Sequence, residues 1–332
     1  MPTAFVTGGT GFVGHHLVQL LLGNGWEVVA LRRGDSQSPF RNEEGIRWCV
    51  GDLRDRDFVR RAMAGSTAVF HVAADYRLWA KDPIDMYATN VAGTGIVLEA
   101  ALANGVDRVV YTSTVGALGA RNNGLPADEE TPRCLADMVG HYKRSKYLAE
   151  RKAEGYLSAG LDVVFVHPST PIGPGDYKPT PTGKIIVDFL SQRLPAFVDT
   201  GLNLIHVKDV AAGHLLALER GRTGEKYILG NKNLTLSEIL LMLEDVSGIR
   251  ASRRRLPLGP VLLAAQVSEV ISRLTGKEPL IPLEGVRMAK NHMYFDASKA
   301  VRDLGLPQTP VWLALREAVD WFRSHGYTAS RC

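Results

Sequence analysis

The sequence has little cysteine and no long apolar run, and both absences exclude classes of protein. Cys49, Cys134 and Cys332 are the three cysteines among 332 residues, and no CxxC pair or cysteine–histidine ligand spacing occurs. Such scattered thiols predict a reducing compartment and no structural metal site. A run of about twenty apolar residues, which a membrane-spanning helix needs, is missing. The N-terminus lacks the basic segment of a signal peptide, so we expect a cytoplasmic protein.

Strong charge of either sign is absent as well. The net charge is +4, with 45% hydrophobic and 22% charged residues. This balance is ordinary for a globular protein and too diffuse to indicate nucleic-acid binding, although it permits anionic ligands such as nucleotides. A chain of this length buries a large core, and we expect one large domain or two closely linked ones.

The first half alternates short apolar runs with helical patterns. Strand-like runs lie at 3–7, 28–31, 47–50, 68–73, 108–114 and 162–168, and one of the intervening helices is expected over 84–104. Strands that alternate with helices predict an α/β fold, here a Rossmann-like, doubly wound parallel sheet covered on both faces.

The second half has a different pattern. A Pro/Gly-rich stretch at 167–183 predicts a long structured loop, and two short strands are expected at 226–229 and 293–296. Further helices are expected at 184–193, 208–220, 235–247, 259–274 and 310–324. We therefore predict a dinucleotide-binding domain over 1–168 with returning elements near 204–230. A smaller, mostly helical substrate lobe then comprises 169–203 and 231–332.

A glycine-rich turn, "TGGTGFVG" at 7–14, follows the first strand and opens the first helix. In a dinucleotide-binding turn the first glycine permits a tight bend and the second lets backbone amides approach the pyrophosphate. The third allows close packing of helix on strand. The alternative is an ordinary strand–helix turn, but the flanking strand and helix favour a nucleotide site. The predicted contacts are Gly8, Thr10, Gly11, Phe12 and Val13.

The second strand ends in "ALRRGDS" at 30–36, where an acidic residue would select NAD(H). Arg32 and Arg33 stand there instead, and guanidinium groups suit a 2′-phosphate, so the sequence favours NADP(H) over NAD(H). The alternative is a pair of solvated surface arginines. After the third strand, Asp52 and Leu53 occupy a position suited to an adenine contact.

Tyr142 and Lys146 are four residues apart, which places both side chains on one face of a helix. A tyrosine and a lysine at this spacing often occur by chance on exposed helices. The position of this pair favours a functional role, because the pair follows the strand end "YTST" at 111–114 by about thirty residues in a chain that already has the glycine turn.

These features together resemble the extended short-chain dehydrogenase/reductase family, also described as NAD-dependent epimerases/dehydratases. The resemblance covers essentially the whole chain. It rests on "TGGTGFVG" at 7–14, "DL" at 52–53, "HVAA" at 71–74, Asn90, "YTST" at 111–114, "YKRSK" at 142–146, "HPSTPIGP" at 167–174, "HVKDVAAGHLLAL" at 206–218 and "YFDASKAVRDLG" at 294–305. Several stretches, "HVAADYRLWAKDP" and "HYKRSKYLAE" among them, resemble the hopanoid-associated sugar epimerases, a subgroup similar to dihydroflavonol 4-reductases.

The resemblance implies roles for individual residues. Tyr142 is the expected general acid/base, Lys146 supplies the charge that makes its phenol useful near neutrality and binds the nicotinamide ribose, and Thr114 orients the substrate oxygen. Further cofactor contacts are expected from Ala73, Ala74, Thr112, Tyr142, Pro168, Ser169 and Thr170. Asn90 is expected to bind backbone near the site. His167 is either a structural residue or a substrate contact.

The substrate and the reaction are less constrained. Substrate loops are expected at 75–82, 135–142, 174–184 and 200–206, and they carry Asp75, Tyr76, Trp79, Met138 and Tyr177. These side chains fit a partly hydrophobic small molecule, although Trp79 and Met138 are equally explained as core packing. We favour net reduction of a carbonyl, in hopanoid lipid biosynthesis. The alternatives are a sugar epimerase/dehydratase and a non-catalytic NADP-sensing module.

Two expectations concern surfaces. Segment 250–277 places four arginines ahead of an apolar helix, which suits peripheral contact with an anionic membrane; the alternative is a helix packed within the small lobe. Family analogy also implies a homodimer through the helices near 84–104 and 142–158.

Overall fold

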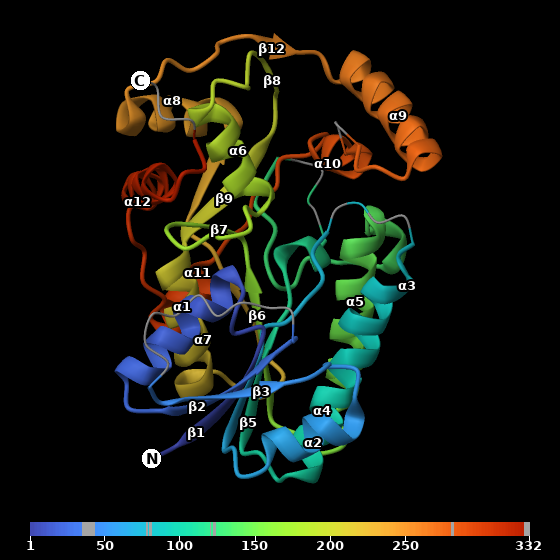
Figure 1. The fold of residues 1–332 in the computed structure, drawn as a ribbon, viewed down its shortest axis with the longest axis vertical. Helices are drawn as coiled ribbons and strands as arrows, with labels where there is room; N and C mark the ends of the chain where they lie inside the picture. Colours follow the sequence, from blue (N-terminus) through green and yellow to red (C-terminus); the bar gives the residue numbers. More distant parts are fainter. Residues whose placement is uncertain are drawn as a thin grey trace.

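A seven-stranded parallel sheet runs through the computed structural model, which describes residues 1–34, 44–77, 79, 82–119, 121, 124–279 and 282–328 (Figure 1). Cys332 and parts of the predicted stretches 30–36 and 75–82 lie outside the described residues. The strand order is β10-β6-β5-β4-β1-β2-β3. The strands are β1 (Thr3–Thr7), β2 (Glu27–Arg32), β3 (Ile46–Val50), β4 (Ala68–His71), β5 (Arg108–Thr112), β6 (Val163–Pro168) and β10 (Lys226–Leu229).

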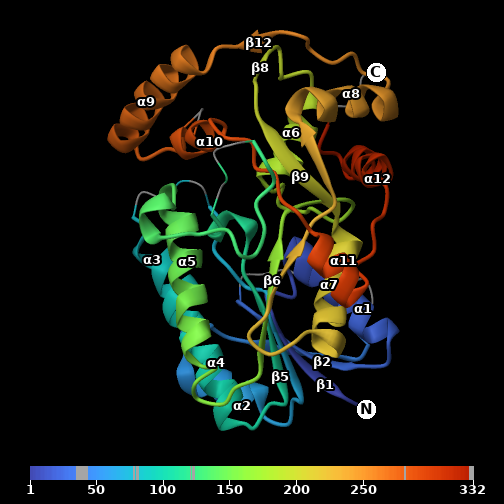
Figure 2. The same ribbon diagram turned by 180° about the vertical axis from the view of Figure 1, so that it is seen from behind.

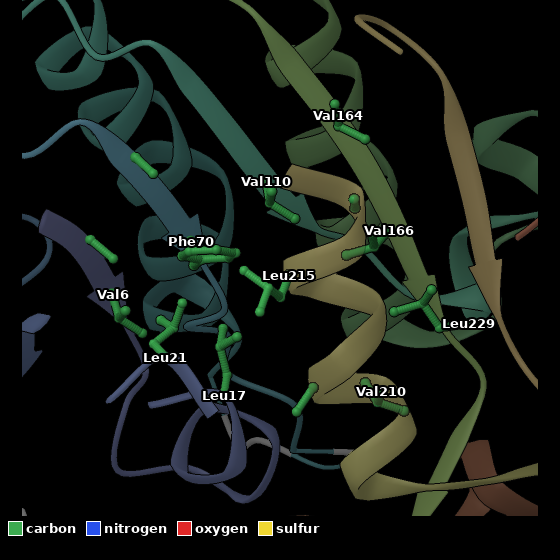
Figure 3. Packing of buried hydrophobic residues seen from close by; sticks show 14 of the residues in the cluster. Val6, Leu17, Leu21, Phe70, Val110, Val164, Val166, Val210, Leu215 and Leu229 are labelled. Atoms are coloured by element: carbon green, nitrogen blue, oxygen red, sulfur yellow. The ribbon is translucent and has the colours of Figure 1, made fainter. Parts of the chain in front are cut away.

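Helices cover both faces of this sheet, which explains why the strands in its middle, β1, β4, β5 and β6, are mostly apolar and buried. Successive strand side chains point to opposite faces. Ala4 and Val6 therefore join one buried cluster and Phe5 the other. The first face is covered by α1 (Phe12–Gly23), α7 (Val207–Arg220) and α11 (Ser298–Leu304), the second by α2 (Arg56–Met63), α4 (Gly93–Ala103) and α5 (Gly140–Gly155). Figure 3 shows Val210 and Leu215 of α7 facing the sheet.

The smaller region mixes short sheets with helices. Its three-stranded sheet contains β7 (Thr170–Ile172), β9 (Gly201–His206) and β11 (Lys232–Thr235), with β9 in the centre. A third apolar cluster joins this sheet to α6 (Pro181–Leu190), α8 (Leu236–Ser247) and α12 (Val311–Ser324). Figure 2 shows, at the end farthest from the N-terminus, β8 (Phe197–Val198), β12 (Arg255–Leu256), α9 (Leu258–Thr275) and α10 (Leu283–Met288). The predicted fold class, an α/β doubly wound sheet with a smaller lobe, is confirmed.

Two predicted loops contain regular structure. Segment 200–206 was expected to be a substrate loop, but residues 201–206 form the buried strand β9, paired with β7 and β11. The prediction is wrong because Asn203, a poor strand former, has its amide bonded inside the sheet to Asn233 (2.8 Å). The predicted loop 167–183 contains β7 and the first turn of α6, where Thr180 caps the helix and Pro181 occupies its first position.

Other boundaries also differ from expectation. The helix predicted over 84–104 is broken into α3 (Ile84–Tyr87), a π-helical turn (Ala88–Ala92) and α4. The strand predicted over 108–114 ends at Thr112, because Thr114 caps a 3₁₀ turn (Val115–Ala117). The strand predicted at 293–296 makes only isolated bridges among the described residues, at Met293 and Phe295.

Candidate active site

In the glycine turn between β1 and α1, the backbone approaches both the segment after β4 and the first turn of α1. The space left at Gly8 and Gly14 is too small for a side chain. Gly8 has a left-handed backbone (φ +76°), and a Cβ there would lie 2.7 Å from the backbone nitrogen of Ala73. A Cβ on Gly14 would lie 2.1 Å from the carbonyl oxygen of Gly8. Each glycine is therefore required by the backbone, Gly8 for the approach of β4 and Gly14 for the packing of α1 on the turn.

The first turn of α1 is arranged to receive an anion. Gly11 is the residue that precedes the helix, so no side chain caps it, and the first turn contains no acidic residue. The first amides of a helix have no partner within the helix, and they carry partial positive charge. The backbone at Phe12 and Val13, with neighbouring Thr10, can therefore hold a pyrophosphate.

Arginine side chains lie at the end of β2, as predicted. The Arg32 guanidinium stacks over the ring of Trp48, 5.2 Å from its centroid, while Arg33 is exposed. The pKa of Asp52 is lowered by its hydrogen bonds with Arg54 and, to a smaller extent, by the charge of Arg33. This places Arg33 near the predicted adenosine end of the site, where its guanidinium is available to a phosphate.

The predicted adenine contacts Asp52 and Leu53 follow β3. The Asp52 carboxylate is already engaged by Arg54, 2.7 Å away. Leu53 is buried and packs beside Gly93 at the start of α4. Leu53 thus forms part of the wall behind the site, and any adenine contact by Asp52 occurs beside the Arg54 ion pair.

Tyr142 and Thr114, which the sequence places 28 positions apart, are hydrogen-bonded through their side chains. Thr114 is positioned by the turn after β5, where its hydroxyl oxygen accepts a hydrogen bond from Gly116 N (3.1 Å). Burial raises the pKa of Tyr142 to about 12, and the hydrogen bond with Thr114 only partly opposes this rise. The phenol is therefore held in its protonated form, which is the form that donates a proton.

Lys146 lies one helical turn beyond Tyr142 and is buried. Its ammonium donates to the backbone oxygen of Thr112 (2.7 Å) and lies over the ring of Tyr111, 4.9 Å from the centroid. Burial lowers the pKa of Lys146 to about 8, against the opposing charge of Glu150. Burial is the largest cause of the pKa shift of Tyr142, and the expected effect of the Lys146 charge on the phenol stays a prediction.

The predicted nicotinamide-side residues come from the ends of β4, β5 and β6. Ser169 follows Pro168 and precedes Thr170, and its hydroxyl oxygen is buried without a hydrogen-bond partner. A buried polar atom without a partner is costly, and a carboxamide or ribose group placed there would satisfy it. Ala73 donates its backbone N–H to Thr7 (3.2 Å), and Ala74 is the next residue. The Thr112 hydroxyl is bonded to His214 (2.9 Å), so only its backbone reaches Lys146.

A buried carboxylate on α5 was not predicted. Glu150, two turns beyond Tyr142, is fully buried and binds Arg133 (2.5 Å), His167 (2.9 Å) and Lys226 (3.3 Å). Burial alone would raise its pKa, but His167 and Arg133 hold the pKa well below its usual value. His167 is therefore a structural residue. Its partners come from distant segments, so no sequence spacing could have identified Glu150.

The predicted substrate residues separate into two groups. Tyr76 is half-exposed, and its pKa is raised by burial and by the charges of Asp176 and Asp75, while Tyr76 in turn raises the pKa of Tyr142. These residues gather near Tyr142. Asp176, which was not predicted, is buried, and its pKa is raised by burial to about 6.

The second group has other partners. Met138 is only 2% exposed, which favours the packing alternative. Tyr177 packs against His15 of α1 and Trp321 of α12, with ring centroids 6.0 and 5.1 Å apart. Trp79 is partly buried. The Asn90 side chain accepts a hydrogen bond from Asp75 N (2.8 Å) and donates one to Asp75 O (2.9 Å), as predicted. It also donates to the Ser145 hydroxyl.

A doubly wound sheet, an anion-receptive glycine turn, and a Thr–Tyr–Lys set formed by the turn after β5 and helix α5 define an NAD(P)-dependent oxidoreductase or epimerase. The chain belongs to the NAD-dependent epimerase/dehydratase family, whose model matches residues 4–230. The donor groups described above fit that family's dinucleotide: the first turn of α1 for the pyrophosphate and Ser169 for the nicotinamide side.

Relatives support this assignment over the whole chain. A Synechocystis protein named "Putative dihydroflavonol 4-reductase" is 48% identical, covering 98% of this chain and 96% of the relative. Sterol demethylase protein B of Methylococcus capsulatus is 33% identical, covering 98% and 99%. A crystal structure of a nucleoside-diphosphate-sugar epimerase from Pseudomonas aeruginosa is similar, with a TM-score of 0.81, 26% identity and 99% coverage of both chains.

Proposed function

We propose that this protein is an NADP(H)-dependent reductase that reduces a carbonyl group on an apolar, lipid-type small molecule. The protonated Tyr142 phenol carries this proposal, because a reductase must deliver a proton to the oxygen that becomes an alcohol. A tyrosine with a pKa near 12 that is bonded to Thr114 holds that proton at neutral pH. The nicotinamide, when bound, supplies the hydride.

The residues of this chain divide the remaining work. Thr114 and Tyr142 hold the substrate oxygen between two hydroxyl groups, and Tyr142 passes its phenolic proton to that oxygen. The ammonium of Lys146 stabilises the negative charge left on the phenol oxygen. Reprotonation of Tyr142 from solvent then restores the site.

Arg32 and Arg33 support NADP(H) rather than NAD(H). β2 ends at Arg32, and Arg33 follows with an exposed guanidinium near Asp52. Ribose hydroxyls are normally received here by a carboxylate, whereas guanidinium groups pair with a 2′-phosphate. NADP(H) also suits a net reduction, in which NADPH is oxidised in each turnover, whereas an epimerase leaves its cofactor unchanged overall.

The substrate class rests on the surroundings of Tyr142 and on the names of relatives. Tyr76 contributes an aromatic ring beside the catalytic tyrosine, and a relative at 33% identity is named for sterol demethylation. We extend this to hopanoid-type lipids on the resemblance of "HVAADYRLWAKDP" and "HYKRSKYLAE" alone. The likeness to a sugar epimerase structure favours epimerisation as the second candidate.

Substitution of Tyr142→Phe tests the catalytic role. We expect a loss of about 10³-fold in kcat for NADPH-dependent reduction of a sterol or triterpenoid ketone, because general acid catalysis is removed. NADPH binding, followed by its fluorescence, should remain within about threefold of the wild type, because the phenol is not among the predicted pyrophosphate contacts. Unchanged turnover would contradict the proposed role. Product formation without net NADPH oxidation would identify an epimerase instead.

A further inference from the structure

Helix α9 presents an apolar stripe to solvent instead of to the protein. Val267, Ile271 and Leu274 are 53%, 54% and 82% exposed, and Leu263 and Val270 are also exposed. Their spacing of three and four residues places them on one side of the helix. Within α9 only Ala265 and Ser272 are buried, and α10 is the main neighbouring element. A surface helix normally turns such a stripe toward a core, so this face is suited to an apolar partner.

Positive charge is concentrated on the same segment. Residues 250–277 contain six basic side chains and one acidic one, a net charge of +5, although the whole chain has +4. The rest of the molecule is therefore slightly negative. Arg253, Arg254 and Arg255 are exposed immediately before α9, with Leu256 (42% exposed) and Pro257 between them and the helix. An exposed apolar stripe beside a basic cluster is the combination that partitions into an anionic bilayer surface.

The segment adjoins the catalytic helix. α9 packs on α10, and Glu284 of α10 accepts a hydrogen bond from the backbone of His141 (3.1 Å), the residue before Tyr142. Gly140 has a left-handed backbone (φ +81°), and a Cβ there would lie 2.1 Å from the Glu284 carboxylate. The beginning of α5 is thus in direct contact with the helix pair that carries the apolar stripe. Figure 1 shows α9 and α10 beyond one end of α5.

We propose that the α9 surface, defined as the apolar stripe of α9 together with Arg250 and Arg253–Arg255, docks the enzyme on an anionic membrane. None of the helices in the described part of the chain is long and apolar enough to cross a bilayer, so this contact is interfacial. A second copy fits less well, because a two-fold contact through this face would oppose two segments of charge +5. An anionic bilayer complements both the charge and the apolar stripe.

Flotation of the full-length protein with vesicles tests this proposal. The probes are vesicles of phosphatidylcholine alone and of phosphatidylcholine with about 30% phosphatidylglycerol. We expect binding to the anionic vesicles at low salt and at least about tenfold weaker binding in about 0.5 M salt, where charges are screened. Absence of binding to anionic vesicles would overturn the proposal.

Matched double variants separate the α9 surface from general surface effects. Val267→Gln with Ile271→Gln should reduce vesicle binding at least about tenfold, whereas Leu241→Gln with Val301→Gln, exposed apolar residues of α8 and α11, should not. Arg250→Ala with Arg254→Ala should also weaken binding, in contrast to Arg60→Ala with Arg61→Ala on α2. If a double variant of the α9 surface and its control double variant reduced vesicle binding equally, the proposal would be contradicted.

Two further measurements distinguish loss of membrane binding from misfolding and from loss of a dimer. Thermal melting and NADPH binding of the Val267/Ile271 variant should match the wild type, because both residues are exposed and lie outside the glycine turn. Light scattering without vesicles measures oligomeric state. A dimer that dissociates on these substitutions would assign the α9 surface to a second copy and overturn the membrane proposal.

Discussion

At the scale of single residues, the site depends on the contacts that position the buried ammonium of Lys146. The Lys146 ammonium contacts Thr112 O and Tyr111, and Tyr111 is hydrogen-bonded with Thr94. Thr94 is in turn 2.9 Å from His71, whose pKa is lowered to about 3 by burial and by the charge of Lys146. His71 is therefore neutral at physiological pH, and a chain of neutral polar groups positions the lysine.

This network reaches the cofactor turn as well. The other ring nitrogen of His71 is 2.7 Å from the hydroxyl of Thr7, which accepts a hydrogen bond from Ala73 N. The glycine turn and Lys146 are thus joined through buried hydrogen bonds that involve three strand ends. Ala73 and Thr112 were expected only as cofactor contacts, and their hydrogen bonds with Thr7 and Lys146 were not predicted, because buried hydrogen bonds between distant residues leave no spacing to detect.

The pH profile follows from the pKa of Lys146. A lysine with a pKa lowered to about 8 is charged below that pH and neutral above it. We expect kcat/KM for reduction to be constant from about pH 6 to 7 and to fall tenfold per unit as pH rises beyond about 8. Initial rates of NADPH oxidation measure this profile. A profile that stays flat to about pH 9.5 would contradict the assignment, and Lys146→Arg should shift the decline upward because arginine stays charged.

At the scale of elements, the glycine turn was predictable and several strands were not. Gly8, Gly11 and Gly14 lie within seven residues, so their spacing carries the signal. The Tyr142–Lys146 pair is equally local. In contrast, β9 forms because it pairs with both β7 and β11. This pairing overrides the local preference of Asn203 and of the proline-rich stretch.

Two glycines of α1 provide a matched test of the turn. A Cβ on Gly14 would lie 2.1 Å from Gly8 O, whereas a Cβ on Gly23 meets nothing within 4 Å. We expect Gly14→Ala to lower the free energy of unfolding by about 2 kcal/mol or more and to abolish NADPH binding. Gly23→Ala should leave binding unchanged and raise stability by up to about 1 kcal/mol. Chemical denaturation and fluorescence titration measure both quantities, and tolerance of Gly14→Ala would refute the close approach.

The buried Glu150 makes α5 sensitive to a single substitution. Glu150→Gln leaves Arg133 and His167 without their anion and should lower the free energy of unfolding by about 3 kcal/mol at neutral pH. The exposed ion pair of Glu99 with Arg56 provides the control, and Glu99→Gln should change stability by less than about 1 kcal/mol.

The pH dependence of this effect has a defined sign. The folded pKa of Glu150 lies below its ordinary value of 4.5, so its contribution to stability is present above that pH and is lost as the pH falls further. The difference between wild type and Glu150→Gln in urea denaturation should therefore narrow under acidic conditions. A difference that is small at neutral pH, or that widens in acid, would contradict the ion-pair role.

At the scale of the whole molecule, the parallel sheet collects residues from distant segments at one edge. Thr7, Arg32, Thr112 and Pro168 end β1, β2, β5 and β6, which are parallel strands of one sheet. Ligands of open α/β sheets bind at this carboxyl edge. This is why alternation of strands and helices predicted both the fold and the location of the site. The substrate side, which depends on packing between the sheet and the smaller region, was not predictable to the same extent.

Cofactor selection tests the central claim most directly, because it requires no knowledge of the substrate. Isothermal titration of the wild-type protein should give a Kd for NADPH at least about tenfold lower than for NADH, since Arg33 forms a charge-assisted pair with the 2′-phosphate. Arg33→Ala should remove most of this preference and leave NADH binding unchanged. NADH binding as tight as, or tighter than, that of NADPH would contradict the proposed NADP(H)-dependent reductase and favour an epimerase.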